Sequence, residues 1–106
     1  MKVHVEVVSK APPGGRCEFY DRVFFELVKS YENLYYTLIP SNLYEGDVVP
    51  PAVLVNGEVV EPEDALLLTP EEIVEVLRKK GAKPRIPEEE IKGRLERAYD
   101  EFIGGV

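Results

Sequence analysis

Cys17, the one cysteine of the chain, follows a Gly14-Gly15-Arg16 run and is followed by apolar residues at helical spacing. Its thiol would therefore lie at a helix N-terminus beside a guanidinium. Both features stabilise a thiolate and lower the thiol pKa, although the neighbouring Glu18 carboxylate opposes this. Cys17 is thus a candidate nucleophile. The alternative is that it packs in the interior as a small apolar side chain.

The sequence lacks the residues that a metal site or an internal disulfide requires. One cysteine cannot form an internal disulfide or a multi-cysteine zinc site, and the single histidine cannot complete a ligand set. His4 lies on the polar side of a predicted strand, where we expect it to be solvated. The sequence predicts no metal site and no cofactor.

The charge of the chain limits its partners. Its 106 residues suffice for one domain, and 20 acidic against 13 basic residues give a net charge of −7. This charge argues against nucleic acid or an anionic membrane as a partner. The absence of glutamine, with abundant Glu, Lys, Arg and Pro, is typical of proteins from heat-adapted sources.

No segment reads as a membrane span or a leader. The longest uncharged apolar stretch, Val48 to Val55, contains two prolines and is much shorter than the ~18 to 20 residues of a membrane helix. The first residues, Met-Lys-Val-His-Val-Glu, pass directly into strand-like alternation without an apolar leader region. We therefore expect a cytoplasmic protein.

The first half of the chain predicts a strand, a helix and a second strand. Apolar and polar residues alternate over residues 2–8, which predicts a strand, and the breaker-rich residues 9–16 predict a loop. Helical spacing of apolar residues predicts a helix over 17–31, and residues 34–39 are β-branched and aromatic, as in a strand. Residues 40–49 read as a loop with room for one helical turn.

The second half predicts a hairpin and two helices. Asn56-Gly57, the dipeptide preferred in tight hairpins, separates strands over 52–55 and 58–60. A capping box at Thr69 to Glu72, with Pro70 at the first helical position, opens a helix that ends at Gly81. After a linker over 82–85, residues 87–103 read as an amphipathic helix.

This order of elements predicts an α/β fold. A βαβ unit followed by a hairpin in the same sheet gives a mixed four-stranded sheet with packed helices, β-α-β-β-β-α, which is a thioredoxin-like arrangement with an added C-terminal helix. We expect a thioredoxin-like domain over residues 1–81. Residues 82–106 form a linker and an amphipathic helix.

Two segments carry a family resemblance. The run Pro51 to Val60, together with Leu68 to Ile73, resembles the second half of the small archaeal and bacterial thioredoxin-like redox proteins. The resemblance implies that Pro51 is the cis-proline that faces the redox motif, with Pro50 as the rival candidate. Because Pro50 has no N–H, one of the hydrogen bonds that such proteins make to a bound peptide would be missing.

The redox motif itself departs from the family. Where those proteins carry Cys-x-x-Cys, this chain carries Gly14-Gly15-Arg16-Cys17, so glycine occupies the position of the attacking cysteine. The resemblance implies a substrate groove formed by Gly14, Gly15, Arg16, Pro50 and Pro51. A glutathione site is not expected, because Glu61-Pro62 follows the hairpin where glutaredoxin-like proteins carry Gly-Gly.

Two functions follow from this comparison. The first is single-thiol disulfide exchange at Cys17 with a protein or a small thiol, without dithiol reductase activity, because one thiol cannot resolve a mixed disulfide. The second is a non-catalytic protein-binding or assembly module that keeps the fold and the groove. Whether the chain is an enzyme stays open at this point.

The predicted helix over 87–103 needs a surface for its apolar stripe. Ile91, Leu95, Tyr99 and Phe102 share one face, and a helix of this length depends on burying such a face to stay ordered. It either folds back on its own domain or pairs with the same helix of a second chain. The stiff linker with Pro84 favours a homodimer through 87–103.

Overall fold

The computed structural model describes residues 1–63 and 66–104 and contains both strands and helices. The strands of this part of the chain are β1 (Val3–Ser9), β2 (Leu34–Pro40), β3 (Ala52–Val55) and β4 (Glu58–Val60). Its helices are α1 (Gly15–Ser30), α2 (Pro70–Lys79) and α3 (Glu88–Gly104), and η1 (Ser41–Leu43) is a single turn of 3-10 helix. Residues 105–106, the last two of the predicted C-terminal segment, lie outside the described residues.

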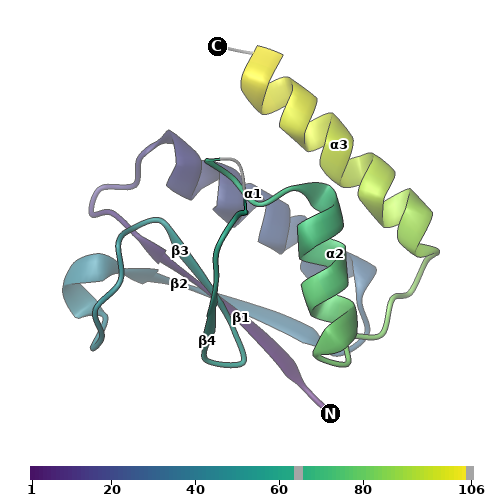
Figure 1. Ribbon diagram of the computed structural model, residues 1–106, viewed down its shortest axis with the longest axis horizontal. Coiled ribbons are helices and arrows are strands. Elements are labelled where there is room, and N and C mark those ends of the chain that lie inside the picture. The colour runs from purple at the N-terminus through teal and green to yellow at the C-terminus, as the bar shows by residue number, and fades with distance from the viewer. Residues whose placement is uncertain (64–65, 105–106) are drawn as a thin grey trace.

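The four strands form one mixed sheet in the order β2-β1-β3-β4 (Figure 1). β1 and β2 are parallel, with Val3 beside Leu34, whereas β1 and β3 are antiparallel, with Val5 beside Val55. β4 pairs antiparallel with β3 across the Asn56-Gly57 turn. The predicted α/β class with a mixed four-stranded sheet is confirmed.

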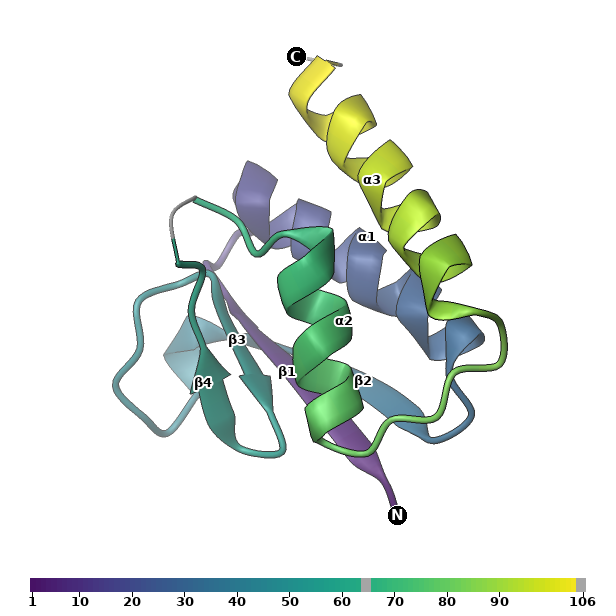
Figure 2. The same ribbon diagram turned by 45° about the vertical axis from the view of Figure 1, so that its right-hand side comes forward.

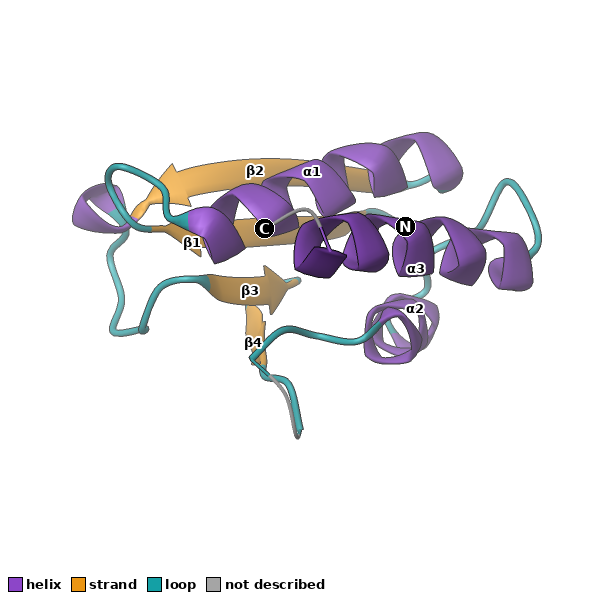
Figure 3. Cartoon of the chain, turned by 90° about the horizontal axis from the view of Figure 1, so that it is seen from above, coloured by secondary structure: helices purple, strands orange, loops and turns teal. Residues whose placement is uncertain are grey.

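The two faces of the sheet are covered unequally. Val3, Val5 and Val7 of β1 point to the side that carries α1, α2 and α3, where the main core lies (Figures 2 and 3). On the other side Val8 packs with Ala52 and Leu54 under the segment that follows β2. Because β3 contributes to both cores, its four residues are all buried, which explains why this strand is entirely apolar.

α1 starts two residues earlier than the apolar spacing predicts. Gly14 is the N-cap, and its carbonyl accepts a hydrogen bond from the Glu18 amide at 3.0 Å. Glycine is tolerated at an N-cap, and residues before the first apolar position carry no periodic signal, so the sequence pattern begins too late. Cys17 is therefore the third residue of α1 rather than its first.

The local turn and cap signals are confirmed. Asn56 and Gly57 both have positive φ, 49° and 84°, as the hairpin turn requires. The Thr69 hydroxyl accepts from the Glu72 amide, and the Glu72 carboxylate accepts from the Thr69 amide at 2.8 Å. Pro70 is the first residue of α2, which ends at Lys79, and Gly81 follows with a φ of 90°.

The linker between α2 and α3 turns back onto the domain. Pro84 forms a β-bridge with Tyr31, flanked by hydrogen bonds from the Glu32 amide to the Lys83 carbonyl and from the Arg85 amide to the Ser30 carbonyl, both 2.8 Å. These bonds fix the direction of the chain on both sides of Pro84. The proline therefore does not direct α3 away from the domain, contrary to the expectation from its stiffness.

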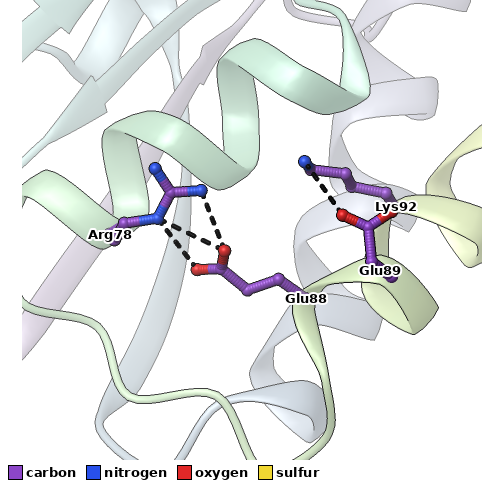
Figure 4. Close-up of polar contacts among 4 residues, drawn as sticks. All are labelled: Arg78, Glu88, Glu89 and Lys92. Carbon is purple, nitrogen blue, oxygen red and sulfur yellow. Dashed lines mark hydrogen bonds and ion pairs between the residues drawn. The ribbon is translucent and has the colours of Figure 1, made fainter.

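α3 packs against α1 and α2 of its own chain. Ile91 and Leu95 are buried in the main core, and Tyr99 and Phe102 contact its edge. Arg78 of α2 pairs with both carboxylate oxygens of Glu88 at the start of α3, with a shortest distance of 2.8 Å, next to an ion pair between Glu89 and Lys92 (Figure 4). The apolar stripe that motivated the homodimer through 87–103 is thus covered within one chain, and that homodimer stays a prediction without an exposed stripe to support it.

Candidate functional site

A groove runs along the N-terminal end of α1, between this helix and the β3–β4 hairpin. It encloses about 600 Å³. Its apolar wall includes Val49, Val59 and Leu66, which are 86%, 47% and 78% exposed. Arg16 lies on the same groove, together with the acidic residues Asp47 and Glu61. Apolar side chains this exposed, gathered around one concave surface, are typical of a binding site.

A second, more apolar hollow of about 410 Å³ shares Arg16 and Leu66 with the groove. Its remaining walls are Leu67 and the C-terminal part of α3, including Phe102 and Ile103. The two hollows therefore meet at Arg16. Together they form a continuous surface that begins at the hairpin and ends at α3.

The position of Leu68, just before α2, depends on two tyrosines. The Tyr20 hydroxyl accepts a hydrogen bond from the Leu68 amide at 2.9 Å, and the Tyr99 hydroxyl donates to the Leu68 carbonyl. Burial raises the pKa of both phenols, so both stay protonated at neutral pH. α1 and α3 thereby hold the segment that carries Leu66 and Leu67 in place beside the groove.

The predicted groove residues divide into two sets. Among the described residues, Arg16 and Pro51 line the groove, whereas Gly14, Gly15 and Pro50 do not. The Pro50–Pro51 bond is cis, so the expectation that Pro51 is the cis residue is confirmed. Gly15 instead adjoins Phe102, since a Cβ at this position would lie 4.0 Å from the ring.

Cys17 is not exposed to the groove. Its residue surface is 1% exposed, and its Sγ accepts a hydrogen bond from the Lys10 amide at 3.5 Å. The candidate nucleophile is therefore enclosed between α1 and the loop that follows β1. Arg16, its neighbour in the chain, reaches the groove in its place.

The environment of the Cys17 sulfur still stabilises negative charge. Burial by itself raises the pKa of the Cys17 thiol, but polar groups around the sulfur, first among them the Lys10 amide that donates to it, outweigh this effect. The Lys10 ammonium adds a smaller favourable interaction, and the net result is a pKa below the ordinary value. The thiol is thus activated but shielded from a large disulfide substrate.

Several groove residues carry no distinctive signal in the sequence. Val49 and Leu66 lie in connecting segments, where an isolated apolar residue predicts nothing about binding. Val59 belongs to the predicted strand over 58–60, but the pattern of this strand does not distinguish it from Val60, which also lines the groove. The contribution of Phe102 and Ile103 depends on where α3 docks, which the sequence pattern leaves open.

Within residues 1–63 and 66–104, no group of three or more His, Cys, Asp or Glu side chains is placed to hold a metal ion. None of the helices in this part of the chain is long and apolar enough to cross a membrane.

Comparison with known proteins identifies no relative of this chain. No protein-family model, no curated protein and no solved structure matches this chain.

Proposed function

We propose that this chain is a thioredoxin-fold binding module that holds an extended apolar peptide segment of a partner protein in the groove beside Arg16 and Pro51. The observation that carries the proposal is the contrast between the buried Cys17 sulfur and the open apolar groove. Two features support the thioredoxin-like assignment. The βαβ unit of β1, α1 and β2 is followed by a hairpin in the same sheet, and Pro51 faces the start of α1 across the groove.

The chemistry of the groove favours contacts with side chains over contacts with the peptide backbone. Val49, Val59 and Leu66 present apolar surface, and burying it stabilises a complex in proportion to the area removed from water. Pro51, which lines the groove, has no N–H to donate to a bound strand. We therefore expect specificity for alternating apolar side chains and little dependence on backbone pairing at this position.

Peptide binding tests the proposal directly. A fluorescein-labelled octapeptide of alternating leucine and serine should bind the full chain, as measured by anisotropy. Val59→Asp and Leu66→Asp should each weaken binding about tenfold or more, because a carboxylate replaces apolar contact surface. Leu43→Asp is the matched control, since Leu43 is 70% exposed and lies outside the groove. Equal affinities of all four proteins would overturn the proposal.

The second candidate function is single-thiol exchange at Cys17. It is favoured by the hydrogen bond that the Lys10 amide donates to the Cys17 sulfur, because such a bond stabilises a thiolate. Exchange would require the loop over residues 10–14 to open so that the sulfur can reach a disulfide. Rapid formation of a mixed disulfide with oxidised glutathione at neutral pH, lost in Cys17→Ser, would favour this function over the binding module.

A further inference from the structure

β2 is an outer strand of the sheet, and the six residues that precede its terminal Pro40 have none of the features that normally prevent strand pairing. Among the described residues it pairs only with β1, so the backbone groups on its other side have no partner strand in this part of the chain (Figure 3). It is seven residues long and contains no charged side chain. Proteins usually protect such an edge with a short strand, a charge, a proline or a bulge.

The opposite edge of the same sheet is protected. β4 has three residues and begins with Glu58, and Glu61-Pro62 follows it directly. A proline and two carboxylates around so short a strand make pairing with another strand unfavourable. The difference between the two edges points to β2 as a surface adapted for pairing.

We propose that β2 pairs antiparallel with β2 of a second copy of this chain, so that the two sheets join into one continuous sheet about a two-fold axis at Thr37. Glu32 before the strand and Pro40 at its end bound the segment available for pairing. Pairing over the whole strand places Thr37, its central residue, opposite Thr37 of the other copy. This inference is independent of the peptide groove, which lies beside β3 and β4 at the opposite edge of the sheet from β2.

The side chains of β2 complement themselves in this register. Tyr36 falls opposite Leu38 on the helix-covered face, and Tyr35 falls opposite Ile39 on the other face. Aromatic side chains opposite aliphatic ones stabilise antiparallel pairs. Tyr35 is 48% exposed and Leu38 is 37% exposed, so both have surface to bury.

The uncharged side chains of β2 keep charge repulsion out of the central contact between two copies. Each chain carries a net charge of −7, which opposes association, and pairing through an uncharged strand brings no like charges directly opposite each other. α1 contacts β2 through the hydrogen bond between Asp21 and Tyr36 at 2.6 Å. Phe25, one turn further along α1, is 60% exposed and adds apolar surface on this side of the molecule.

Sedimentation of the full chain and of three variants tests the proposal. We expect a dimer for the full chain and for Thr37→Val, which loses the hydrogen bond to His4 but keeps an uncharged β-branched strand. Thr37→Lys places two ammonium groups opposite each other and should raise the dissociation constant about tenfold or more. Val59→Lys puts the same charge on β4, the opposite edge, and should leave the dimer intact.

Cross-linking tests the register and does not depend on how well Thr37→Lys folds. In a Cys17→Ala background, Thr37→Cys should oxidise to a covalent dimer, because directly opposed residues lie about 4.5 to 5.5 Å apart at their Cα atoms. Tyr35→Cys is the control, since its two copies would lie four residues apart, or about 13 Å. A monomeric full chain at about 500 µM, open-ended oligomers, or equal cross-linking of both variants would overturn the proposal.

Discussion

Arg16 and Cys17 are consecutive residues of α1, yet Arg16 lines the open groove shared with Pro51 while the Cys17 sulfur is buried against the Lys10 amide. The N-terminal turn of the helix therefore separates the exposed cation from the shielded thiol. Under the proposed function, a peptide in the groove would contact the guanidinium without reaching the sulfur. This separation is the structural basis for assigning binding rather than thiol exchange to the groove.

Alkylation of Cys17 should be slow in the folded protein despite the lowered pKa of its thiol. Iodoacetamide must reach the sulfur, and burial restricts access to molecules that have opened locally. We expect labelling of the folded protein to be at least about a hundredfold slower than labelling in denaturant. Mass spectrometry follows the labelling over time. Comparable rates in the two conditions would show that the loop over residues 10–14 opens freely.

Tyr31→Phe should stabilise the protein. The Tyr31 side chain is among the most buried in the chain, and its hydroxyl has no hydrogen-bond partner among the described residues. Removing an unpaired buried hydroxyl is expected to raise the free energy of unfolding by about 1 kcal/mol at pH 7. Urea unfolding of the two proteins measures this difference, and a loss of stability would contradict it.

Tyr31→Phe should also change how the free energy of unfolding depends on alkaline pH. Burial raises the pKa of Tyr31 to about 12, with the Glu88 carboxylate adding to the shift and Arg78 opposing it. A folded-state pKa above the unfolded value near 10 means that the neutral form stabilises the fold below pH 10 and that this contribution is lost as pH rises toward 12. The advantage of Tyr31→Phe should therefore grow over this range. A difference independent of pH between 9 and 12 would argue against a buried phenol.

Glu72→Gln should destabilise the protein only above acidic pH. Burial raises the pKa of Glu72, but hydrogen bonds from the Thr69 and Glu63 amides lower it below its usual value near 4.5. The carboxylate therefore stabilises the fold above pH 4.5, and this stability is lost as pH falls through the lower folded-state pKa. Thermal unfolding should show a difference of about 1 kcal/mol at pH 7 that disappears well below pH 4. A constant difference would assign the effect to packing.

Leu95→Ala tests whether α3 is part of the core. Leu95 is buried against α1 and α2, so its truncation should cost about 2 to 4 kcal/mol of the free energy of unfolding. Ile103→Ala on the same helix is the control, because Ile103 is 65% exposed and its truncation should cost less than about 0.5 kcal/mol. Similar small effects of both changes would mean that α3 does not dock on the domain in solution.

Features encoded by a few neighbouring residues could be predicted from the sequence. The Asn56-Gly57 turn needs positive φ at both positions, and the capping box needs only Thr69 and Glu72, so each is determined locally. Alternation predicts β1, β-branched and aromatic composition predicts β2, and the turn dipeptide predicts the β3–β4 hairpin. The start of α1 was missed because Gly14 and Gly15 carry no apolar periodicity.

Features that depend on distant contacts could not be predicted. The docking of α3 on its own domain depends on hydrogen bonds between residues 30–33 and 81–85, which no local sequence pattern predicts. The burial of Cys17 depends on the path of the loop that precedes α1. Arg16 and Pro51, two of the residues expected at a groove from the resemblance, line this hollow, whereas Val49 and Leu66 can be assigned to it only from the placement of the hairpin and α1.

Binding of the leucine-serine octapeptide by Cys17→Ala is the most direct test of the central claim, which is that the groove binds peptide without the thiol. The affinity of Cys17→Ala should lie within about twofold of the unmodified chain, with or without reductant, because Cys17 does not line the groove. Mass spectrometry should find no covalent adduct when the peptide carries a disulfide. Loss of binding in a folded Cys17→Ala protein, or a mixed disulfide at Cys17 in the unmodified chain, would contradict the account.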